Sequence, residues 1–442
     1  MLCRRERSPP RWTRCWVLLL AASSMAVPST QGAIGAGAAS VAGRSRPLQR
    51  ARPSLQLRGG CEAGAAAPDI TELMGPKSNI VMAIASKVGR NLHNKMDHPL
   101  QIIKTWITQH FSDTFVDASG SPIFACLDTL SPVVSTTMCF DDLLTPPDHP
   151  SRSRSDTYYL DDTRLLRSHM TAHQTTILRQ GLRAFLYTGD VYRRDAVDSC
   201  HYPCFHQMDG VRVYEWKALG VASHEEAVPI VMEDLKGTLA GMVKSIFGDV
   251  EMKWVESTFP FTDPSLELEI LFQGKWLEVL GCGVMRSKIL QNGGLFEHTG
   301  WAFGLGLERL AMILFQVPDI RLFWTEDERF TAQFVGAVAS GRRNLKFVPF
   351  SKYPVCYKDV SFWHEPSLTD NDVAEVVRTV CGDLVEDVQV VDSFVHPKTQ
   401  RHSRCYRVCY RAMDRTLTNE EVDALQAQLC SALVSDLSVQ LR

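Results

Sequence analysis

The segment from Gly300 to Phe315 constrains the fold of this chain more than any other part of the sequence. Its glycines are spaced among apolar residues, and a continuous apolar run follows the pair Glu308-Arg309. Glycines let a strand backbone approach a bound ligand closely, and the residues from Leu307 onward have the pattern of an apolar helix. We therefore expect a strand that runs into a helix, with Arg309 at the helix start, where a guanidinium can reach a phosphate.

The spacing of these glycines argues against two common nucleotide-binding loops. A dinucleotide-binding loop is the simplest alternative, but the required G-x-G-x-x-G sequence is absent from the segment. A G-x-x-x-x-G-K-[ST] sequence is absent from the whole chain, which disfavours a P-loop nucleotidase. A nucleotide site here must therefore be of another kind.

A second candidate phosphate site lies between Gly189 and Asp195. Arg193 stands at the end of a predicted strand, and a return strand begins near Phe205. A guanidinium at this place can bond phosphate oxygens bidentately while the intervening loop closes over them. An isolated Arg-Arg-Asp sequence is more often a solvated surface ion pair, so both interpretations stay open on this segment alone.

Hydrophobic periodicity predicts a mixed set of helices and strands before residue 337. The predicted helices are Val81–Leu92, His98–His110, Thr163–Ala184 and Glu226–Phe247, and the predicted strands are Ala184–Arg193, Gln207–Tyr214, Leu266–Phe272 and Trp276–Cys282. Only one of these helices, Glu226–Phe247, lies between two of the strands, so strands outnumber the connecting helices and do not alternate strictly with them. This order favours an α+β fold with a largely antiparallel sheet.

A boundary is predicted between Ala337 and Asn344, where small and basic residues interrupt the pattern. Beyond it we expect a strand region, a helix, two strands, a helix and a short strand, at 347–363, 369–381, 384–395, 403–411, 418–437 and 439–442. That order is the split βαβ, or ferredoxin-like, α/β sandwich. We therefore expect one domain over residues 69–336 and a second over residues 345–442.

Residues 1–68 have the composition of an organelle-targeting peptide. They contain ten arginines, no lysine, and only Glu6 and Glu62 as acids, among many alanines, glycines and serines. Such a stretch buries no core, and its Arg-rich, acid-poor bias is typical of transit peptides. The apolar run from Cys15 to Val27 also resembles a secretory signal, as in a bipartite plastid address, while a mitochondrial presequence is the simpler alternative. We expect the mitochondrial matrix, the plastid stroma or both.

The composition, the net charge and the length of the longest apolar run indicate a globular chain without a membrane span. With 45% hydrophobic and 22% charged residues over 442 positions, we expect two or three domains. The net charge of −3 requires any nucleic-acid contact to come from a local basic patch. The longest apolar run, Trp16 to Val27, is too short to cross a bilayer, so no membrane partner is expected.

The thirteen cysteines form no compact framework and are expected to be reduced thiols. A zinc site is the alternative for Cys200, His201, Cys204 and His206. Cys405 and Cys409 lie in a strand-like pattern, where positions four apart stand roughly 13 Å apart and cannot chelate one ion. We therefore predict no protein-bound metal site.

Together, the two phosphate segments resemble motifs 2 and 3 of the class II aminoacyl-tRNA synthetases, as Tyr-Arg-Arg-Asp at 192–195 and Gly-Leu-Gly-Leu-Glu-Arg at 304–309. Six further segments, at 140–143, 148–152, 166–174, 205–207, 259–262 and 276–283, narrow the resemblance to the phenylalanyl-tRNA synthetases of the single-chain mitochondrial or organellar type. The resemblance runs from about Lys87 to the C-terminus, and its combined motifs are highly specific.

The resemblance implies a class II catalytic core with a mostly antiparallel sheet, followed by a ferredoxin-like anticodon-binding domain. It implies ATP-dependent activation of L-phenylalanine to phenylalanyl-adenylate, and its transfer to the 3′ end of tRNA(Phe) in organellar translation. The expected cofactors are ATP and the Mg²⁺ carried with it. The expected partners are L-phenylalanine and tRNA(Phe), and a monomer is expected.

The resemblance also assigns site residues. Those expected at ATP are Arg193, Cys200, His201, Tyr202, Phe205, Glu278 and Arg309, of which Arg193, Arg309 and Glu278 are the expected catalytic residues. Those expected at phenylalanine are His169, Thr171, Ala172, His173, Gln174, Gln207, Met208, Asp209, Phe259, Phe261, Gly281, Gly283, Ala302 and Phe303. Phe259 and Phe261 match two aromatics that meet the substrate ring edge-to-face, which suits two same-facing positions of one strand. Ala302 matches the residue that limits the depth of the pocket. No general base is needed, because adenylation is an in-line displacement.

Three positions depart from the usual pattern of the family. Motif 2 usually ends in glutamate, but here it ends in Asp195, and the mitochondrial form shares this aspartate. Thr171 replaces the usual serine, and Asp209 replaces the usual glutamate. Each of the last two keeps the required hydrogen-bonding group, and their effect on amino-acid selectivity is open.

Basic residues of the C-terminal part are the expected tRNA contacts: Lys398, Arg401, Arg404, Arg407 and Arg411. In a strand-like stretch they are predicted to form a stripe across one sheet face, which suits an RNA backbone. A solvated charged face is the alternative.

Two rival functions belong to other classes. A non-catalytic paralogue that binds tRNA would keep the fold but lose phosphate-binding arginines, whereas Arg193 and Arg309 are both present. Another enzyme of the superfamily, such as a different synthetase or a biotin ligase, is disfavoured by the Phe-Pro-Phe sequence at 259–261 and by the C-terminal domain.

Overall fold

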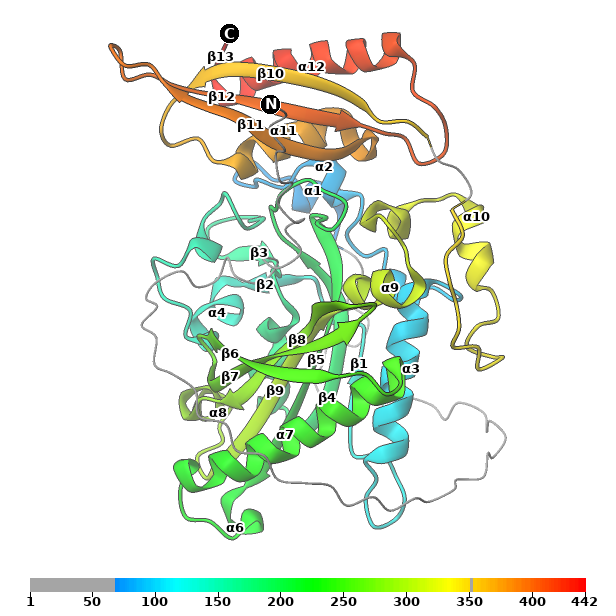
Figure 1. Ribbon diagram of the computed structural model, residues 1–442. Helices are drawn as coiled ribbons and strands as arrows, with labels where there is room; N and C mark the ends of the chain where they lie inside the picture. Colours follow the sequence, from blue (N-terminus) through cyan, green and yellow to red (C-terminus); the bar gives the residue numbers. More distant parts are fainter. Residues whose placement is uncertain (1–67, 350–352) are drawn as a thin grey trace, which may run out of the picture.

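The fold is described from a computed structural model for residues 68–349 and 353–442. The predicted targeting peptide, residues 1–68, lies outside this part of the chain except for its last residue. The described residues form two sheet-based units that lie against each other, the larger one below and the C-terminal one above in Figure 1. Among them, no helix combines the length and the apolar character needed to cross a membrane.

The larger unit is built on a seven-stranded sheet with the strand order β1-β4-β5-β9-β8-β7-β6. These strands are β1 Ala125–Leu127, β4 Ala184–Tyr192, β5 Cys204–Glu215, β6 Met252–Phe259, β7 Thr262–Phe272, β8 Lys275–Met285 and β9 His298–Gly306. Every neighbouring pair is antiparallel except β1 and β4, which run parallel. The prediction of a mostly antiparallel α+β core is confirmed.

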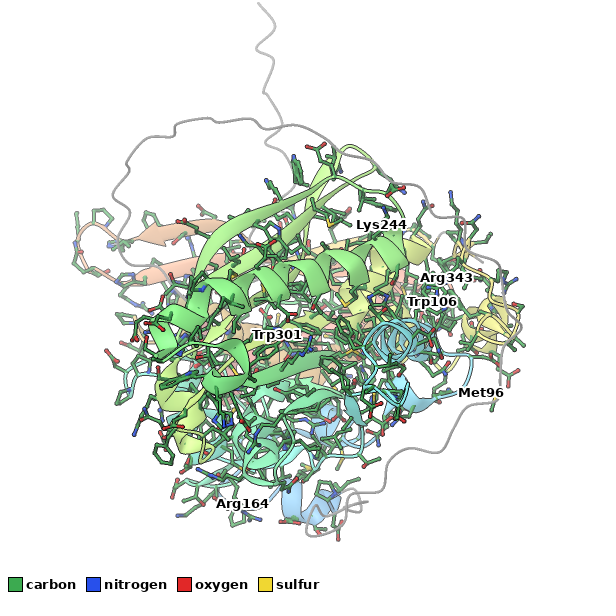
Figure 2. All side chains as sticks on the ribbon, turned by 90° about the horizontal axis from the view of Figure 1, so that it is seen from below. Met96, Trp106, Arg164, Lys244, Trp301 and Arg343 are labelled. Carbon is green, nitrogen blue, oxygen red and sulfur yellow. The ribbon has the colours of Figure 1, made fainter. Side chains whose placement is uncertain are left out.

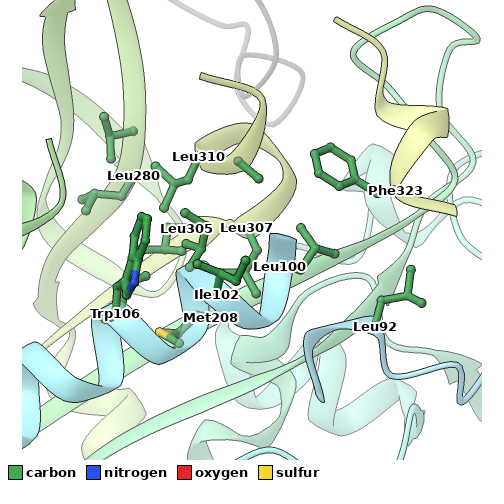
Figure 3. Packing of buried hydrophobic residues seen from close by; sticks show 14 of the residues in the cluster. Leu92, Leu100, Ile102, Trp106, Met208, Leu280, Leu305, Leu307, Leu310 and Phe323 are labelled. Atoms are coloured by element: carbon green, nitrogen blue, oxygen red, sulfur yellow. The ribbon is translucent and has the colours of Figure 1, made fainter. Parts of the chain in front are cut away.

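Three helices cover one face of this sheet: α3 Pro99–Thr114, α7 His224–Phe247 and α9 Leu307–Phe315. The view from below in Figure 2 shows α7 crossing the sheet, with Trp301 of β9 beneath it. Figure 3 shows Trp106 of α3 beside Met208 of β5 and Leu305 of β9. Because apolar residues of the strands alternate in direction, one set faces these helices and the other set faces the opposite side of the sheet.

Two helix predictions were wrong in extent. The predicted helix over 163–184 contains the strand β3 Arg164–Leu166, which pairs with β2 Val133–Ser135, and only α5 Gln174–Arg179 is α-helical. The side chain of Arg167 is buried against Asp190, at 2.5 Å, and this tertiary ion pair holds the chain out of a helix. The predicted helix over 81–92 shrinks to α2 Met82–Ala85, because Gly89 and Asn91 adopt positive φ angles of 78° and 47°.

The C-terminal unit has a four-stranded antiparallel sheet with the order β11-β12-β10-β13. Its elements follow one another as β10 Cys356–His364, α11 Asp370–Cys381, β11 Val385–Val395, β12 His402–Tyr410, α12 Asn419–Leu437 and β13 Gln440–Leu441. The predicted ferredoxin-like order is confirmed, although the first strand begins only at Cys356. Both helices start at a threonine capping box, Thr369 with Asp372 and Thr418 with Glu421, which explains why their predicted starts were accurate.

Short helices connect these elements, and one of them begins the described chain. They are α1 Ile70–Leu73, α4 Thr136–Cys139, α6 Trp216–Leu219, α8 Ser287–Asn292 and α10 Glu328–Thr331. The core of the C-terminal unit lies between its sheet and α11 and α12, where Phe362, Val408 and Leu429 are fully buried. Its opposite sheet face carries no helix in the described part of the chain (Figure 1).

Candidate active site

A cavity of about 170 Å³ opens on the sheet face opposite α3, α7 and α9. Strand alternation determines which side chains reach it. Along β5, Gln207 and Asp209 line the cavity while Met208 between them packs under the helices. Along β9, Ala302, Phe303 and Gly304 line the cavity, although the ring of Phe303 also stacks on Phe111 of α3, with centroids 5.9 Å apart.

Small residues let two side chains of the cavity wall lie close against the strands. Gly281 of β8 lies under Phe259, where an added Cβ would come within 2.9 Å of the ring. An added Cβ at Gly304 would lie 2.9 Å from a carboxylate oxygen of Asp209. Ala302 also lines the cavity and presents only a methyl group to it.

Phe259 and Phe261 form the aromatic wall of the cavity. Their rings are parallel within 8°, with centroids 5.9 Å apart. The prediction that both occupy one strand was wrong, because Phe259 ends β6 and Phe261 lies in the turn before β7. Their common orientation comes from this turn and from packing against Gly281, not from the alternation of a strand.

The opposite end of the cavity is polar and centres on Asp209. Its carboxylate accepts hydrogen bonds from Thr171 Oγ1 at 2.7 Å and from the hydroxyl of Tyr187 at 3.5 Å. Burial raises the pKa of Asp209 to about 7. His169 is half-buried, and burial together with the charge of Arg193 lowers the pKa of His169 to about 3. At neutral pH, this imidazole is therefore a neutral hydrogen-bonding group.

Arg193 follows the end of β4 at the mouth of the polar region. Its Nε donates to the carbonyl of Ser168 at 2.7 Å, and its guanidinium lies over the ring of Phe205 at 5.1 Å. The loop from Arg193 to Pro203 then returns to β5, and His201 of this loop lines the cavity. Arg193 and His201 therefore line one end of the cavity, whereas Phe205 lies beside Arg193 but outside the lining.

Glu278 of β8 and Arg309 of α9 form an ion pair of 3.5 Å outside the lining of this cavity. Burial raises the pKa of Glu278 to about 7, while the charge of Arg309 opposes that shift. One oxygen of Glu278 is buried without a hydrogen-bond partner. A buried carboxylate oxygen without a partner beside a guanidinium is suited to a charged ligand that is still to be bound.

Several predicted phenylalanine contacts do not line the cavity. Ala172 packs in a separate apolar cluster, His173 contacts Arg167 at 3.1 Å, and Gln174 is buried at the start of α5. Gly283 has no Cβ because one there would lie 2.5 Å from the carbonyl of Pro264, so its smallness serves strand packing. Met208 belongs to the core on the helix side of the sheet. Phe303, by contrast, does line the cavity, although its ring stacks on Phe111 of α3.

Cys200 and Tyr202 also lie outside the cavity lining, although both were expected at the nucleotide. The hydroxyl of Tyr202 donates to Asp383 of the C-terminal unit at 2.7 Å, and its ring stacks on Trp324 at 5.6 Å. His206, one of the four residues of the alternative zinc site, pairs instead with Glu308 at 2.7 Å. Within residues 68–349 and 353–442, no three His, Cys, Asp or Glu side chains are grouped to hold a metal.

The cavity also includes residues that were not predicted as site residues. They are Thr145, Pro150, Ser151, Asp156, Thr157, Ser168, Arg194, Asp195, Pro260, Thr262, Cys282, Gly304 and Asn371. Some of them lie in or beside the segments that carried the resemblance, at 148–152 and 192–195, and that was the available signal. Asn371 had none, because it belongs to α11 of the C-terminal unit.

The predicted basic stripe does not occupy one face of the C-terminal sheet. Arg404 points to the helix side and pairs with Asp370 of α11 at 2.8 Å, whereas Arg407 pairs with Asp359 on the other face at 2.8 Å. Arg411 pairs with Glu386, and Arg401 lies over the ring of Trp363 at 4.9 Å. The single-stripe prediction was wrong because positions three apart on a strand face opposite sides.

Comparisons with known proteins agree with this geometry. Residues 91–334 match the family of class II tRNA synthetase core domains (F), and residues 351–442 match the ferredoxin-fold anticodon binding domains. The chloroplastic/mitochondrial phenylalanine–tRNA ligase of Arabidopsis thaliana is 48% identical over 377 residues, covering 85% of each chain. The mitochondrial phenylalanine–tRNA ligase of Mus musculus is 48% identical over 389 residues, covering 83% of this chain and 86% of its own. The mitochondrial enzyme of Saccharomyces cerevisiae is 37% identical over 443 residues, covering 83% and 92%. This chain therefore belongs to the family of organellar phenylalanine–tRNA ligases, with a class II synthetase core and a ferredoxin-fold anticodon-binding domain.

Proposed function

We propose that this protein activates L-phenylalanine with ATP and transfers it to tRNA(Phe) in an organelle. The observation that carries the proposal is the cavity itself, in which an aromatic wall at Phe259 and Phe261 faces small residues at one end and Asp209 is buried at the other. A free α-amino acid with a flat apolar side chain has the matching distribution of ring and ammonium group. The identity of the chain to phenylalanine–tRNA ligases supports the same substrate.

In this proposal the substrate ring lies against Phe259 and Phe261, with the methyl group of Ala302 at the end of its pocket and Gly281 beneath Phe259. Edge-to-face contacts with an aromatic pair favour a ring over an aliphatic side chain of similar volume. Ala302 limits the depth of the pocket, so the phenolic oxygen of tyrosine would meet its methyl group.

The substrate ammonium group is assigned to Asp209, with Gln207 and Thr171 beside it. The oxygen of the Gln207 amide accepts from the backbone N–H of Met170 at 3.3 Å, which fixes its orientation toward the cavity. Thr171 and His169 complete the polar end as neutral groups. Thr171 stands where the family usually has serine, and its hydroxyl donates to Asp209, so the hydrogen-bonding group of the serine is retained.

ATP use follows from the class II core. We assign adenine to Phe205, the α-phosphate and the substrate carboxylate to Arg193, and the γ-phosphate to Arg309, with His201, Cys200 and Tyr202 in the loop above. Arg193 follows β4 and Arg309 lies in α9 directly after β9, and β5 is the strand between β4 and β9 in the sheet. This separation suits two groups that bind different phosphates of one nucleotide.

The Mg²⁺ expected with ATP fits the residues present only in a limited way. Glu278 offers one buried carboxylate oxygen without a partner, whereas the described residues provide no cluster of three ligands. This donor set suits an ion that is bound mainly by phosphates and touches the protein through one carboxylate. When bound, Mg²⁺ neutralises charge on the phosphates, and the protein supplies the arginines around them.

The reaction that these residues support has two steps. A carboxylate oxygen of phenylalanine attacks the α-phosphorus, the bond to the β-phosphate bridging oxygen breaks, and pyrophosphate leaves with the electron pair. A ribose hydroxyl at the 3′ end of tRNA then attacks the carbonyl carbon of the adenylate, and AMP departs. The first step depends on alignment and charge neutralisation by Arg193 and Arg309, and in the second step Arg193 remains beside the α-phosphate of the departing AMP.

The C-terminal unit is assigned to tRNA, with catalysis in residues 69–336 and anticodon binding in residues 345–442. Lys398, Arg401, Arg404, Arg407 and Arg411 remain the proposed contacts, although most of them are ion-paired in the free protein. Phosphate oxygens would have to replace those carboxylate partners. We further propose that the protein acts as a monomer in the mitochondrial matrix, the plastid stroma or both.

Aminoacylation tests the whole proposal. Purified protein is incubated with ATP, organellar or bacterial tRNA(Phe) transcript and radiolabelled phenylalanine, with the tRNA for another amino acid as control. Acid-precipitable label on tRNA(Phe) alone is expected. Charging with a different amino acid, or none with an active preparation, would contradict the proposal and favour another synthetase or a non-catalytic paralogue.

A further inference from the structure

The loop between β4 and β5 is held from outside by the C-terminal unit. Nδ2 of Asn371 donates to the carbonyl of Arg194 at 3.0 Å. Nη1 of Arg378 donates to the carbonyl of Asp195 at 2.5 Å, and the backbone N–H of Val388 donates to the carbonyl of Val197 at 2.9 Å. Three donors from α11 and β11 thus satisfy three carbonyls within four residues of this loop.

A buried carboxylate joins these contacts into one network. Glu375 of α11 accepts from Arg378 at 2.7 Å and from the hydroxyl of Tyr158 at 2.9 Å, and it pairs with Arg194 at 3.8 Å. The side chains of Glu375, Arg378 and Arg194 are only 7%, 9% and 12% exposed. Groups buried this far from solvent make a rigid contact, because each lost partner would leave a charge without compensation.

The same loop forms one wall of the cavity. Arg193, Arg194, Asp195 and His201 all line it, and Asn371 of α11 stands among them. Glu375 and Arg378 do not line the cavity. Any effect of these two residues on a bound nucleotide must therefore pass through the loop, by its backbone or by the side chain of Arg194.

We propose that Glu375 and Arg378 of the C-terminal unit are positioning residues for ATP: they hold residues 194–197 in the conformation in which His201 of the same loop meets the nucleotide. This inference rests on the proposed function and adds a second role to the tRNA-binding unit. A loop fixed before the substrate arrives does not have to be ordered by binding, so the contacts increase affinity for ATP. Phenylalanine is expected to be insensitive to them, because it lies on the sheet and Arg193, assigned to its carboxylate, is held separately by the carbonyl of Ser168.

The test uses the full-length protein and Phe-dependent ATP–pyrophosphate exchange, with ATP and phenylalanine titrated separately. Arg378→Met removes the donor to Asp195, and Val388→Pro removes the backbone donor to Val197 at an outward-facing position of an edge strand. Lys358→Met is the matched control, because Lys358 pairs with Asp423 inside the C-terminal unit, away from the loop.

We expect Arg378→Met and Val388→Pro to raise the KM for ATP about 5- to 30-fold, with the KM for phenylalanine changed less than about twofold. Lys358→Met should leave both constants unchanged, and Arg378→Lys should recover part of the loss because it keeps a charged donor. Thermal unfolding is measured for each variant. Unchanged ATP constants in folded variants, or equal changes in both substrates, would overturn the inference.

Failure of the proposed function is distinguishable from failure of this inference. Wild-type protein without Phe-dependent exchange would remove the function. ATP binding measured by calorimetry on wild type and Arg378→Met would still decide whether the contacts position the loop, since weaker binding in the variant supports the inference and equal binding contradicts it.

Discussion

At the scale of single residues, the site depends on a few charged groups whose surroundings determine their ionisation. Asp209 and Glu278 are carboxylates with raised pKa values, and His169 is an imidazole with a lowered one, in each case because burial disfavours the charged form. Conservative substitutions at these positions therefore test function without large changes of volume.

Asp209 predicts a pH dependence of amino-acid binding. With a pKa of about 7 in the free protein, Asp209 is a carboxylate above that pH and neutral below it. Since only the carboxylate attracts the substrate ammonium, the KM for phenylalanine should rise as pH falls from 8 to 6. Exchange assays across this range check the prediction. Asp209→Asn should weaken binding and lose this dependence, and a wild-type KM that is flat with pH would argue against the assignment.

Arg309 predicts a loss of rate in the first chemical step. Arg309→Ala removes a positive charge next to the expected pyrophosphate, and such a loss should lower the exchange rate on the order of a hundredfold or more. Arg329→Ala is the matched control, because Arg329 forms an exposed ion pair with Asp327. Equal rates in folded Arg309→Ala and control proteins would remove Arg309 from the site.

At the scale of elements, the sequence predicted best where local signals agreed with tertiary packing. The capping boxes at Thr369 and Thr418 and the long apolar pattern of α7 fixed three helices almost to the residue. The region 163–184 was mispredicted because the ion pair of Arg167 with Asp190, 23 residues away, has no local signature. Strand alternation alone would have excluded Met208 from the pocket, since its neighbours on both sides face the cavity.

The orientation of Met208 predicts that truncating its side chain lowers the stability of the protein but leaves phenylalanine binding nearly unchanged. Met208→Ala leaves a cavity in the core under α3, and such truncations cost about 2–5 kcal/mol of unfolding free energy. The KM for phenylalanine should stay within about twofold of wild type, because the side chain faces away from the substrate. Urea unfolding and exchange kinetics measure the two effects. A raised KM without loss of stability would place Met208 in the pocket after all.

At the scale of the whole molecule, the two units share one functional surface. The domain order was predictable from the pattern of elements, but Asn371 in the cavity wall was not, because it meets Arg194 across 177 residues of sequence. Contacts of this kind depend on how the units lie against each other, and no local pattern encodes that arrangement. Under the proposed function, α11 therefore joins the tRNA-binding unit to the wall of the amino-acid cavity.

The basic residues of β12 and its preceding turn predict a salt-dependent tRNA affinity. Replacing Arg401, Arg404 and Arg407 together with alanine should raise the KM for tRNA and flatten its dependence on salt, because fewer counterions are released on binding. Exchange without tRNA should be unaffected. The pairing of Arg404 and Arg407 with Asp370 and Asp359 makes the expected effect smaller than for free cations. A variant that charges tRNA with wild-type salt dependence would reject these residues as phosphate contacts.

The central claim is that the cavity over β5, β8 and β9 selects phenylalanine for reaction with ATP. ATP–pyrophosphate exchange with each of the twenty amino acids in turn tests it most directly. We predict the highest kcat/KM for phenylalanine, with tyrosine next and far behind, because Ala302 and the aromatic wall leave room for a ring without a hydroxyl. Exchange driven best by another amino acid, or by none in a folded preparation, would contradict the account.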